Sequence, residues 1–280
     1  MRDIHIDNII NVVEDLCTKA NYYLNEDIKS SLKEKALEEK SPIGQDILNK
    51  LVENADIAQE KNMPVCQDTG MAIFFVEVGQ EVHITGGSLT EAINEGVRRG
   101  YEKGYLRKSV VRDPLNRINT GDNTPAVIHY DIVPGDQLKI TIAPKGFGSE
   151  NMSALKMLKP SDGIKGVHDF VVRTVDEAGS NPCPPIIVGV GIGGSMEKAA
   201  ILAKKALLRP ITQRHPEEFY RNLEQVLLDS INRLGIGPQG LGGTTTALAV
   251  NIETFPTHIA GLPVAVNISC HVTRHASAVI

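Results

Sequence analysis

The most restrictive feature of this sequence is a change in its hydrophobic period near Pro64. Before this point apolar residues recur every three or four positions, which predicts amphipathic helices over 4–24, 26–39 and 43–60. After it, short apolar runs that are typical of strands alternate with further helical segments. This order predicts an α+β fold with mixed sheets, surrounding helices and a mainly helical N-terminal part, about residues 1–62.

The second part of the chain is expected to alternate between strands and helices. The predicted strands cover 72–78, 82–85, 127–133, 137–143, 186–190, 245–252 and 263–269, and the predicted helices cover 89–101, 164–178, 195–208 and 217–234. Pro134-Gly135-Asp136 predicts a hairpin between 127–133 and 137–143, because Pro presets φ and Gly allows a positive φ. No internal repeat or low-complexity linker occurs, so we expect one domain over residues 1–280.

Composition excludes several classes of protein. The chain has 280 residues and a formal net charge of -5, without the clustered Lys and Arg that phosphate binding needs, so nucleic acid is not an expected partner. No apolar run approaches the roughly 20 residues of a membrane-spanning helix, and the N-terminus lacks the pattern of a secretory signal. We therefore expect no membrane partner and a cytoplasmic location.

The four cysteines differ in their surroundings. Cys17 lies in the apolar stripe of the first predicted helix, whereas Cys66, Cys183 and Cys270 lie in polar or Pro-bounded junctions. Their spacing matches neither a zinc knuckle nor a ferredoxin motif. They are either unrelated small buried residues or thiolates from distant loops that hold three irons of a cubane cluster. A fourth, open iron would then act as a Lewis acid.

Polar residues near the first of these cysteines suit chemistry on a carboxylate. Gln67 can donate a hydrogen bond to a substrate oxygen, and Asp68 can transfer a proton or orient a neighbour, although both also fit a simple turn. Arg107, Arg112 and Arg117 follow in one segment, where a guanidinium group can bind a carboxylate through two hydrogen bonds. Most arginines in such a segment are only solvated, so we expect one or two to be functional.

Two glycine-rich stretches, 145–151 and 240–245, can present backbone N–H groups to an anion or can serve as tight turns. Several basic residues also occur close together in sequence near the C-terminal end, namely His258, His271, Arg274 and His275. A lone His is more often structural, but proximity to Cys270 raises the prospect that one of them transfers protons.

A different class of protein is suggested by the sequence IIVGVGIGGSMEKAA. Its Gly189, Gly191 and Gly194 match the G-x-G-x-x-G fingerprint of dinucleotide-binding folds, between a predicted strand and a predicted helix. Such folds carry an acidic residue about 20 positions further on, at the end of a second strand. This chain has LLRPITQRHP there, which favours neither a strand nor an acidic ribose contact.

Six motifs together resemble one family. They are PVCQDTG, LRKSVVRDPL followed by NTGDNTPAVIHYDIVPGD, PKGFGSENMSALKML, NPCPPIIVGVGIGG, GPQGLGGTTTALAV and ISCHVTRHASA. In this order, over about residues 40–275, they resemble the α subunit of class I, iron–sulfur fumarate hydratases and of their L(+)-tartrate dehydratase relatives.

The resemblance implies a cofactor and a set of site residues. It implies a [4Fe–4S] cluster held by Cys66, Cys183 and Cys270, with the unligated iron toward the substrate. It also implies a substrate pocket lined by Gln67, Asp68, Arg107 and the Gly148 loop, with His258 nearby. Arg112 is close enough to Arg107 in sequence to exchange with it in this comparison.

The same resemblance implies a partner and a reaction. It implies a separate β subunit that carries the remaining catalytic groups, in an α2β2 assembly, and an oxygen-sensitive hydro-lyase that converts fumarate to (S)-malate reversibly. Dehydration of L(+)-tartrate to oxaloacetate is the alternative, and the sequence does not separate these substrates from mesaconate. A non-catalytic scaffold is disfavoured, because it gives no reason for so many polar, glycine-lined loops.

Overall fold

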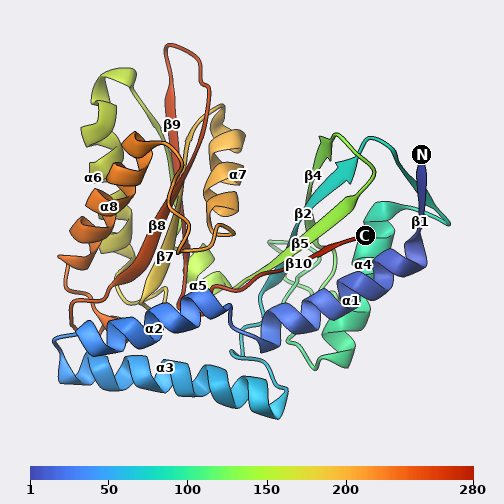
Figure 1. Ribbon diagram of the computed structural model, residues 1–280, viewed down its shortest axis with the longest axis horizontal. Coiled ribbons are helices and arrows are strands. Elements are labelled where there is room, and N and C mark those ends of the chain that lie inside the picture. The colour runs from blue at the N-terminus through green and yellow to red at the C-terminus, as the bar shows by residue number, and fades with distance from the viewer. The chain divides into compact units, whose positions relative to one another are not determined.

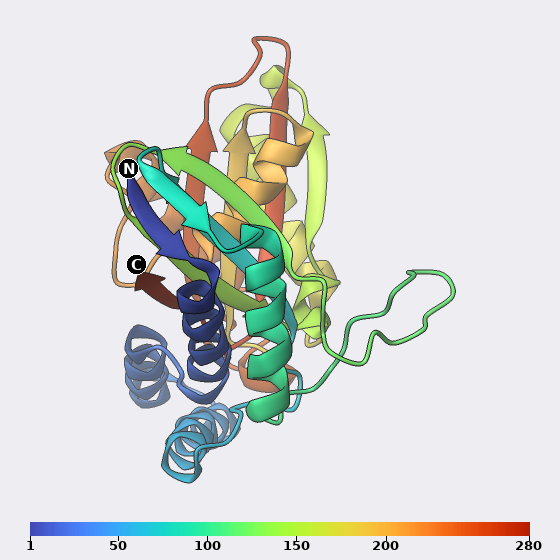
Figure 2. The ribbon, with the colours of Figure 1, turned by 90° about the vertical axis from the view of Figure 1, so that its right-hand side faces the viewer.

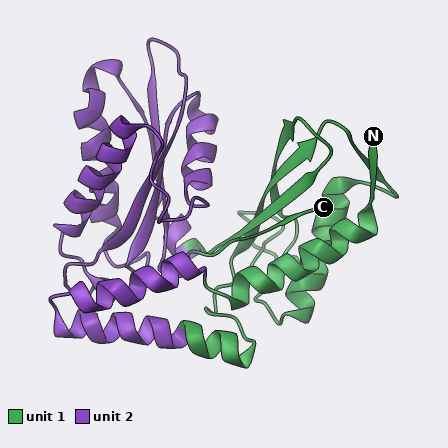
Figure 3. Cartoon of the chain, viewed as in Figure 1, with its two compact units in different colours: residues 1–24, 55–147, 274–280 green, residues 25–54, 148–273 purple.

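The computed structural model describes residues 1–280 and confirms an α+β fold with mixed sheets and a mainly helical N-terminal part (Figure 1). The chain forms two compact units (Figure 3). Unit 1 comprises residues 1–24, 55–147 and 274–280, and unit 2 comprises residues 25–54 and 148–273. None of the helices is long and apolar enough to cross a lipid bilayer.

Unit 1 is built around a four-stranded sheet in the order β10-β5-β2-β4. Its elements are β1 (Arg2–His5), α1 (Ile6–Tyr22), β2 (Met71–Gly79), β3 (Val82–Thr85), α4 (Leu89–Lys103), β4 (Val127–Val133), β5 (Leu138–Lys145) and β10 (Ala276–Val279). Helices α1 and α4 bury their apolar stripes against each other and against the sheet, with Ile9, Val13 and Ile93 completely buried. The short strands β1 and β3 pair in parallel beside this core.

The predicted hairpin between β4 and β5 is wrong. Strand β2 lies between them, parallel to β4 and antiparallel to β5. The reason is the unbroken buried run Ala72–Val76 in β2, since a strand buried on both faces is stabilised most at the centre of a sheet. The turn at Gly135 remains, and its carbonyl oxygen accepts a hydrogen bond from Glu81 N (3.0 Å), beyond the end of β2.

The last strand was not predicted from the sequence. Residues 276–279 form β10, which pairs antiparallel with β5 at the edge of the unit 1 sheet. Four residues are too few for a clear alternation of apolar and polar side chains, so only the long-range pairing defines this strand.

Unit 2 contains a second four-stranded sheet, in the order β6-β9-β7-β8. Its elements are α2 (Glu26–Glu38), α3 (Pro42–Lys61, which continues into unit 1), β6 (Ala154–Leu158), α6 (Gly163–Ala178), β7 (Ile186–Gly193), α7 (Met196–Ala206), α8 (Glu218–Asn232), β8 (Ala247–Phe255) and β9 (Leu262–Ser269), and α5 (Phe147–Glu150) begins at the junction of the units. Helices α6 and α8 cover one face of this sheet and α7 covers the other (Figure 1). Every residue of β7 is therefore buried.

The G-x-G-x-x-G pattern has a packing explanation in this unit. A Cβ atom on Gly189 would lie 2.1 Å from the carbonyl oxygen of Ala203, and one on Gly191 would lie 2.0 Å from that of Ala199. Both carbonyls belong to α7, so these glycines let the helix approach β7 closely. Glycine at these positions is accounted for by helix–sheet contact without a dinucleotide.

We expect Gly191→Ala to destabilise unit 2, because its methyl group would overlap the α7 backbone. Overpacking of this kind costs about 1–3 kcal/mol, which urea denaturation followed by circular dichroism would measure. Gly261→Ala is the matched control, since the nearest atoms to its Cβ are 3.8 Å away or more. Equal stability of the two variants would contradict this packing explanation.

Candidate functional site

In unit 1, the loop between α3 and β2 holds the first candidate residues. Cys66 and Asp68 are half-buried, and Gln67 is exposed. The Asp68 carboxylate accepts hydrogen bonds from Gly70 N (3.0 Å) through Oδ1 and from Phe147 N (3.1 Å) through Oδ2. Two backbone donors thus fix the orientation of one acidic side chain that remains partly accessible.

Arg107 is attached to this loop through its backbone. Thr69 is buried, and its hydroxyl accepts a hydrogen bond from Arg107 N (2.8 Å) and lies 3.3 Å from Arg107 O. The Tyr101 hydroxyl donates to Thr69 O (3.0 Å), and burial, followed by repulsion from Cys17, raises the pKa of Tyr101 above its usual value. The Tyr101 phenol therefore stays neutral and donates this hydrogen bond. The backbone of Arg107 is held in place by Thr69, while its side chain is exposed.

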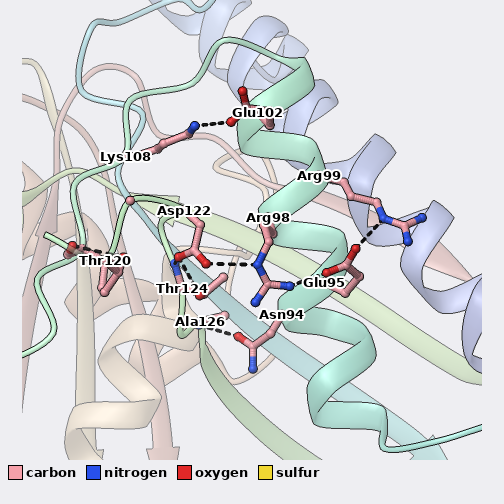
Figure 4. Close-up of polar contacts among 12 residues, drawn as sticks. Asn94, Glu95, Arg98, Arg99, Glu102, Lys108, Thr120, Asp122, Thr124 and Ala126 are labelled. Carbon is pink, nitrogen blue, oxygen red and sulfur yellow. Dashed lines mark hydrogen bonds and ion pairs between the residues drawn. The ribbon is translucent and has the colours of Figure 1, made fainter.

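A second buried anchor, Asn123, joins the ends of the segment that follows Arg107. Its Oδ1 accepts hydrogen bonds from Ser109 N (2.7 Å) and Val110 N (3.2 Å), and its Nδ2 donates to Gly70 O (3.2 Å). Helix α4 holds the same segment from outside through the ion pair of Arg98 with Asp122 (3.0 Å; Figure 4). Asn123 thus joins the segment after Arg107 to Gly70, at the end of the loop that carries Cys66 and Asp68.

Arg112 and Arg117 lie further out on this segment, which Figure 2 shows as a long extended loop. The loop closes through an antiparallel bridge between Val111 and Asn119, and both arginines are exposed. Of the three candidate arginines, Arg107 is the one whose backbone is hydrogen-bonded to the Cys66–Gly70 loop.

Arg274 brings buried positive charge to this part of unit 1. It is 5% exposed, and one of its terminal guanidinium nitrogens donates to the Asp68 backbone oxygen. Its Nε is buried and has no hydrogen-bond partner.

In unit 2, Cys183 and Cys270 lie at the same end of the sheet. Cys183 precedes β7 and Cys270 follows β9, and these antiparallel neighbours pair Ile187 with Ser269. His271 N lies 3.5 Å from Cys183 O, and His271 Nδ1 lies 3.0 Å from the same oxygen. The same Nδ1 also lies 3.2 Å from the donor Gln239 Nε2, so each tautomer of His271 makes one of these two ring contacts a hydrogen bond. Two cysteines that are 87 positions apart in sequence are thus held side by side.

Gly148 belongs to the same region of unit 2. A Cβ atom at Gly148 would lie 3.8 Å from Asn181 O, in the loop that carries Cys183. Its neighbour Glu150 is paired with Lys204 (2.5 Å) and accepts a hydrogen bond from Asn267 Nδ2 (2.9 Å), on the strand that leads to Cys270. The structure therefore brings Gly148 to the end of the sheet that carries these two cysteines.

His258 lies elsewhere in unit 2. It is exposed in the turn between β8 and β9, where its Nδ1 accepts a hydrogen bond from Ala260 N (3.2 Å). Cys270 follows the opposite end of β9, a strand of eight residues that spans roughly 26 Å. Within one chain, the structure therefore does not bring His258 to Cys183 and Cys270.

Both glycine-rich stretches bind carboxylates of the chain itself. In the first, Phe147 N donates to Asp68. In the second, Thr244 N (2.8 Å) and Thr245 N (2.8 Å) donate to the buried carboxylate of Glu39, which also accepts from Ser41 N (3.0 Å). These backbone N–H groups therefore do bind an anionic group, and that group is a carboxylate side chain of the same chain.

Glu39 was not recognised from the sequence, because a Glu at the end of a helix is usually solvated. Burial alone would raise its pKa, but the hydrogen bonds from Ser41, Thr244 and Thr245 lower it to about 2. Because the folded pKa lies below the unfolded one, this stabilisation is present above about pH 4.5 and is lost as the pH falls toward 2.

We expect Glu39→Gln to lower the free energy of unfolding at pH 7 by roughly 2–3 kcal/mol, because an amide cannot accept from all of these donors. The difference from the wild type should shrink between pH 4.5 and pH 2, where Glu39 becomes protonated. Urea denaturation at several pH values measures it. Glu38→Gln, on the exposed neighbour of Glu39, is the control, and a difference that is independent of pH would contradict the assignment.

Comparison with known proteins identifies the family. The sequence model of the fumarate hydratase (Fumerase) family matches residues 10–279. The chain belongs to this family. It is 47% identical over 274 residues to a putative L(+)-tartrate dehydratase subunit alpha of Methanocaldococcus jannaschii, which covers 96% of each chain. It is also 36% identical over 276 residues to the L(+)-tartrate dehydratase subunit alpha of an Escherichia coli strain, over 97% of this chain and 90% of that relative.

The thiols of this fumarase-family chain divide as the sequence predicts. No cysteine forms a disulfide, and Cys17 is completely buried. Burial, with a smaller contribution from Glu14, raises the pKa of Cys17 well above its usual value, so its thiolate is disfavoured. Cys66, Cys183 and Cys270 are each partly or fully accessible. Solvent can therefore reach these three thiols but not that of Cys17.

No three His, Cys, Asp or Glu side chains lie together closely enough to hold a single metal ion. A cubane cluster makes a different demand, because each of its irons takes its own thiolate and the sulfurs need not meet at one point. Cys183 and Cys270 are accessible and lie at the same end of the unit 2 sheet, and Cys66 is an accessible thiol of unit 1. The chemistry of these three thiols fits that kind of donor set.

Proposed function

We propose that this chain is the cluster-binding subunit of a hydro-lyase that reversibly hydrates fumarate to (S)-malate, together with a separate β subunit. The observation that carries this proposal is the family match, which extends over residues 10–279. The relatives named as α subunits support a partner chain, and we propose an α2β2 assembly.

We propose Cys66, Cys183 and Cys270 as the ligands of a [4Fe–4S] cluster. Accessible thiols in all three loops, and the burial of Cys17, support this choice. When bound, a cluster held by three thiolates supplies a Lewis acid at its fourth iron, which polarises a hydroxyl or carboxylate oxygen of the substrate.

Asp68 is proposed as the proton-transferring group of this chain. Hydration joins the oxygen of water to one carbon of fumarate and a proton to the other, and dehydration removes that proton again. The two backbone donors to the Asp68 carboxylate hold it in one orientation, which proton transfer to a defined carbon requires. The remaining catalytic groups, on the β subunit, would complete the exchange.

Arg107, Gln67 and Gly148 are proposed to bind the substrate. A dicarboxylate needs donors, and the exposed Arg107 guanidinium can bind one carboxylate through two parallel hydrogen bonds. Gln67 is exposed beside Asp68, and its amide can donate to a substrate oxygen. Gly148 has no side chain to block the approach of a ligand to its backbone N–H.

His258 is proposed as a second proton-transferring group only where another copy of the chain brings it to the site, because it lies far from Cys270 in its own chain. We expect His258→Ala to lower kcat by about 10²-fold or more without changing the iron content of the assembled enzyme. Steady-state rates and iron analysis measure this. Unchanged rates would remove His258 from the mechanism.

Dehydration of L(+)-tartrate to oxaloacetate is the second candidate, favoured by the names of the relatives. Anaerobic co-expression with the β subunit, followed by assays of fumarate, mesaconate and L(+)-tartrate in parallel, separates the candidates. We expect the highest kcat/KM with fumarate. Activity with tartrate alone would establish the second candidate, and a reaction that depends on nicotinamide would return attention to the Gly189–Gly194 pattern.

A further inference from the structure

Gln239 occupies a backbone conformation that favours glycine. Its φ is +52°, and the flanking turn residues Gly237 and Gly240 also have positive φ. A residue with a side chain loses roughly 1–2 kcal/mol in this region relative to its preferred conformations. Glycine would adopt this conformation without that cost, so the contacts of the Gln239 side chain are of interest.

That contact is with the loop of Cys183. Gln239 donates to the carbonyl oxygen of Pro184 twice, from its backbone N (2.8 Å) and from its side-chain Nε2 (2.7 Å). The preceding carbonyl, that of Cys183, faces the N–H and Nδ1 of His271. Two consecutive peptide groups are thus held from two other loops, at the position where Cys183 itself has a φ of +54°.

The other end of the Gln239 turn is fixed as well. The Glu39 carboxylate binds the amides of Thr244 and Thr245, five and six residues after Gln239. A Cβ atom on Gly243 would lie 2.8 Å from Glu39 Oε1, so the backbone lies directly against this carboxylate. The turn that carries Gln239 is therefore also held by Glu39, which lies between α2 and α3.

We propose that Gln239 is a positioning residue for the Cys183 thiol, and that it slows loss of the cluster by keeping this ligand in place before and after metal binding. The inference rests on the proposed cluster function. A preformed ligand loses less conformational entropy on binding, and removal of residues that orient a ligand typically weakens metal binding by about 10–100-fold.

Gln239→Gly tests this inference, because glycine suits the backbone conformation and the substitution removes the side chain that donates to Pro184 O. We expect the variant to keep or raise the Tm of the wild type but to lose its cluster to an anaerobic chelator about 10–100-fold faster. In apoprotein, alkylation of Cys183 followed by mass spectrometry should be faster, while alkylation of Cys66 is unchanged. The electron paramagnetic resonance spectrum of the loaded protein should also change.

Gln239→Glu is the second variant, since a carboxylate of the same size cannot donate to Pro184 O and should also speed cluster loss. Asn62→Gly is the control for the backbone change, because Asn62 also has a positive φ, +49°, and its side chain accepts a hydrogen bond from the Tyr23 hydroxyl (3.4 Å). Wild-type rates of cluster loss and Cys183 alkylation in both Gln239 variants would overturn this inference alone. A wild type that binds no cluster would overturn the proposed function and the inference with it.

Discussion

Replacing Cys183 by Ser is expected to remove the cluster and with it the activity of the assembled enzyme. Serine keeps the size of the side chain in the loop before β7, but its hydroxyl is a much poorer iron ligand than a thiolate. Loss of a Lewis acid forfeits several kcal/mol of transition-state stabilisation, which corresponds to a fall in kcat/KM of at least about 10³-fold. Iron and sulfide content, visible absorbance and fumarate hydration measure the two effects together.

Cys17→Ser is the matched control for this prediction. Cys17 is 0% exposed in the core of unit 1, so a buried hydroxyl should lower stability there by about 1–3 kcal/mol, while the cluster and its absorbance remain. Cys66→Ser and Cys270→Ser should behave like Cys183→Ser. Equal cluster loss from Cys17→Ser and Cys183→Ser would contradict the division of the four thiols.

The helices of this chain could be predicted from the sequence because their evidence is local. The spacing of Ile9, Val13 and Cys17 predicts α1 directly, and α4 begins after a local cap, Ser88, which accepts a hydrogen bond from Glu91 N (3.4 Å). Strand pairing is not local. The turn at Gly135 correctly indicated a reversal of the chain, but it could not show that β2 would lie between β4 and β5.

The candidate site shows the same limit. The loops of Cys66, Cys183 and Cys270 could be recognised because their polar and Pro-rich contexts are visible in the sequence. The residues that hold these loops could not, because Asn123 contacts Gly70 across 53 positions and Glu39 contacts Thr244 across 205. For Gln239 the sequence contains one weak indication, since it is a large side chain within a glycine-rich segment.

Asp68→Asn is expected to lower kcat for fumarate hydration by about 10²–10⁴-fold, the usual contribution of a positioned acid or base. The amide has nearly the same shape but cannot carry the transferred proton. Its single oxygen can replace only one of the two carboxylate acceptors, so the hydrogen bond from Gly70 N or the one from Phe147 N is lost. The cluster should remain, because no thiol is changed. Anaerobic steady-state kinetics with parallel iron analysis measures the effect.

Asp113→Asn is the control for loss of a carboxylate on another loop of unit 1. Asp113 also accepts two backbone hydrogen bonds, from Leu115 N (2.9 Å) and Asn116 N (2.6 Å), both through Oδ1. Hydrogen bonds from Asn116 and Leu115 lower the pKa of Asp113, so its replacement also removes a hydrogen-bonded carboxylate. It lies on the exposed loop beyond Arg107. If both variants lose activity equally, the loss reflects a disturbed loop and Asp68 does not transfer the proton; if only Asp68→Asn loses activity with its cluster intact, the carboxylate itself is required.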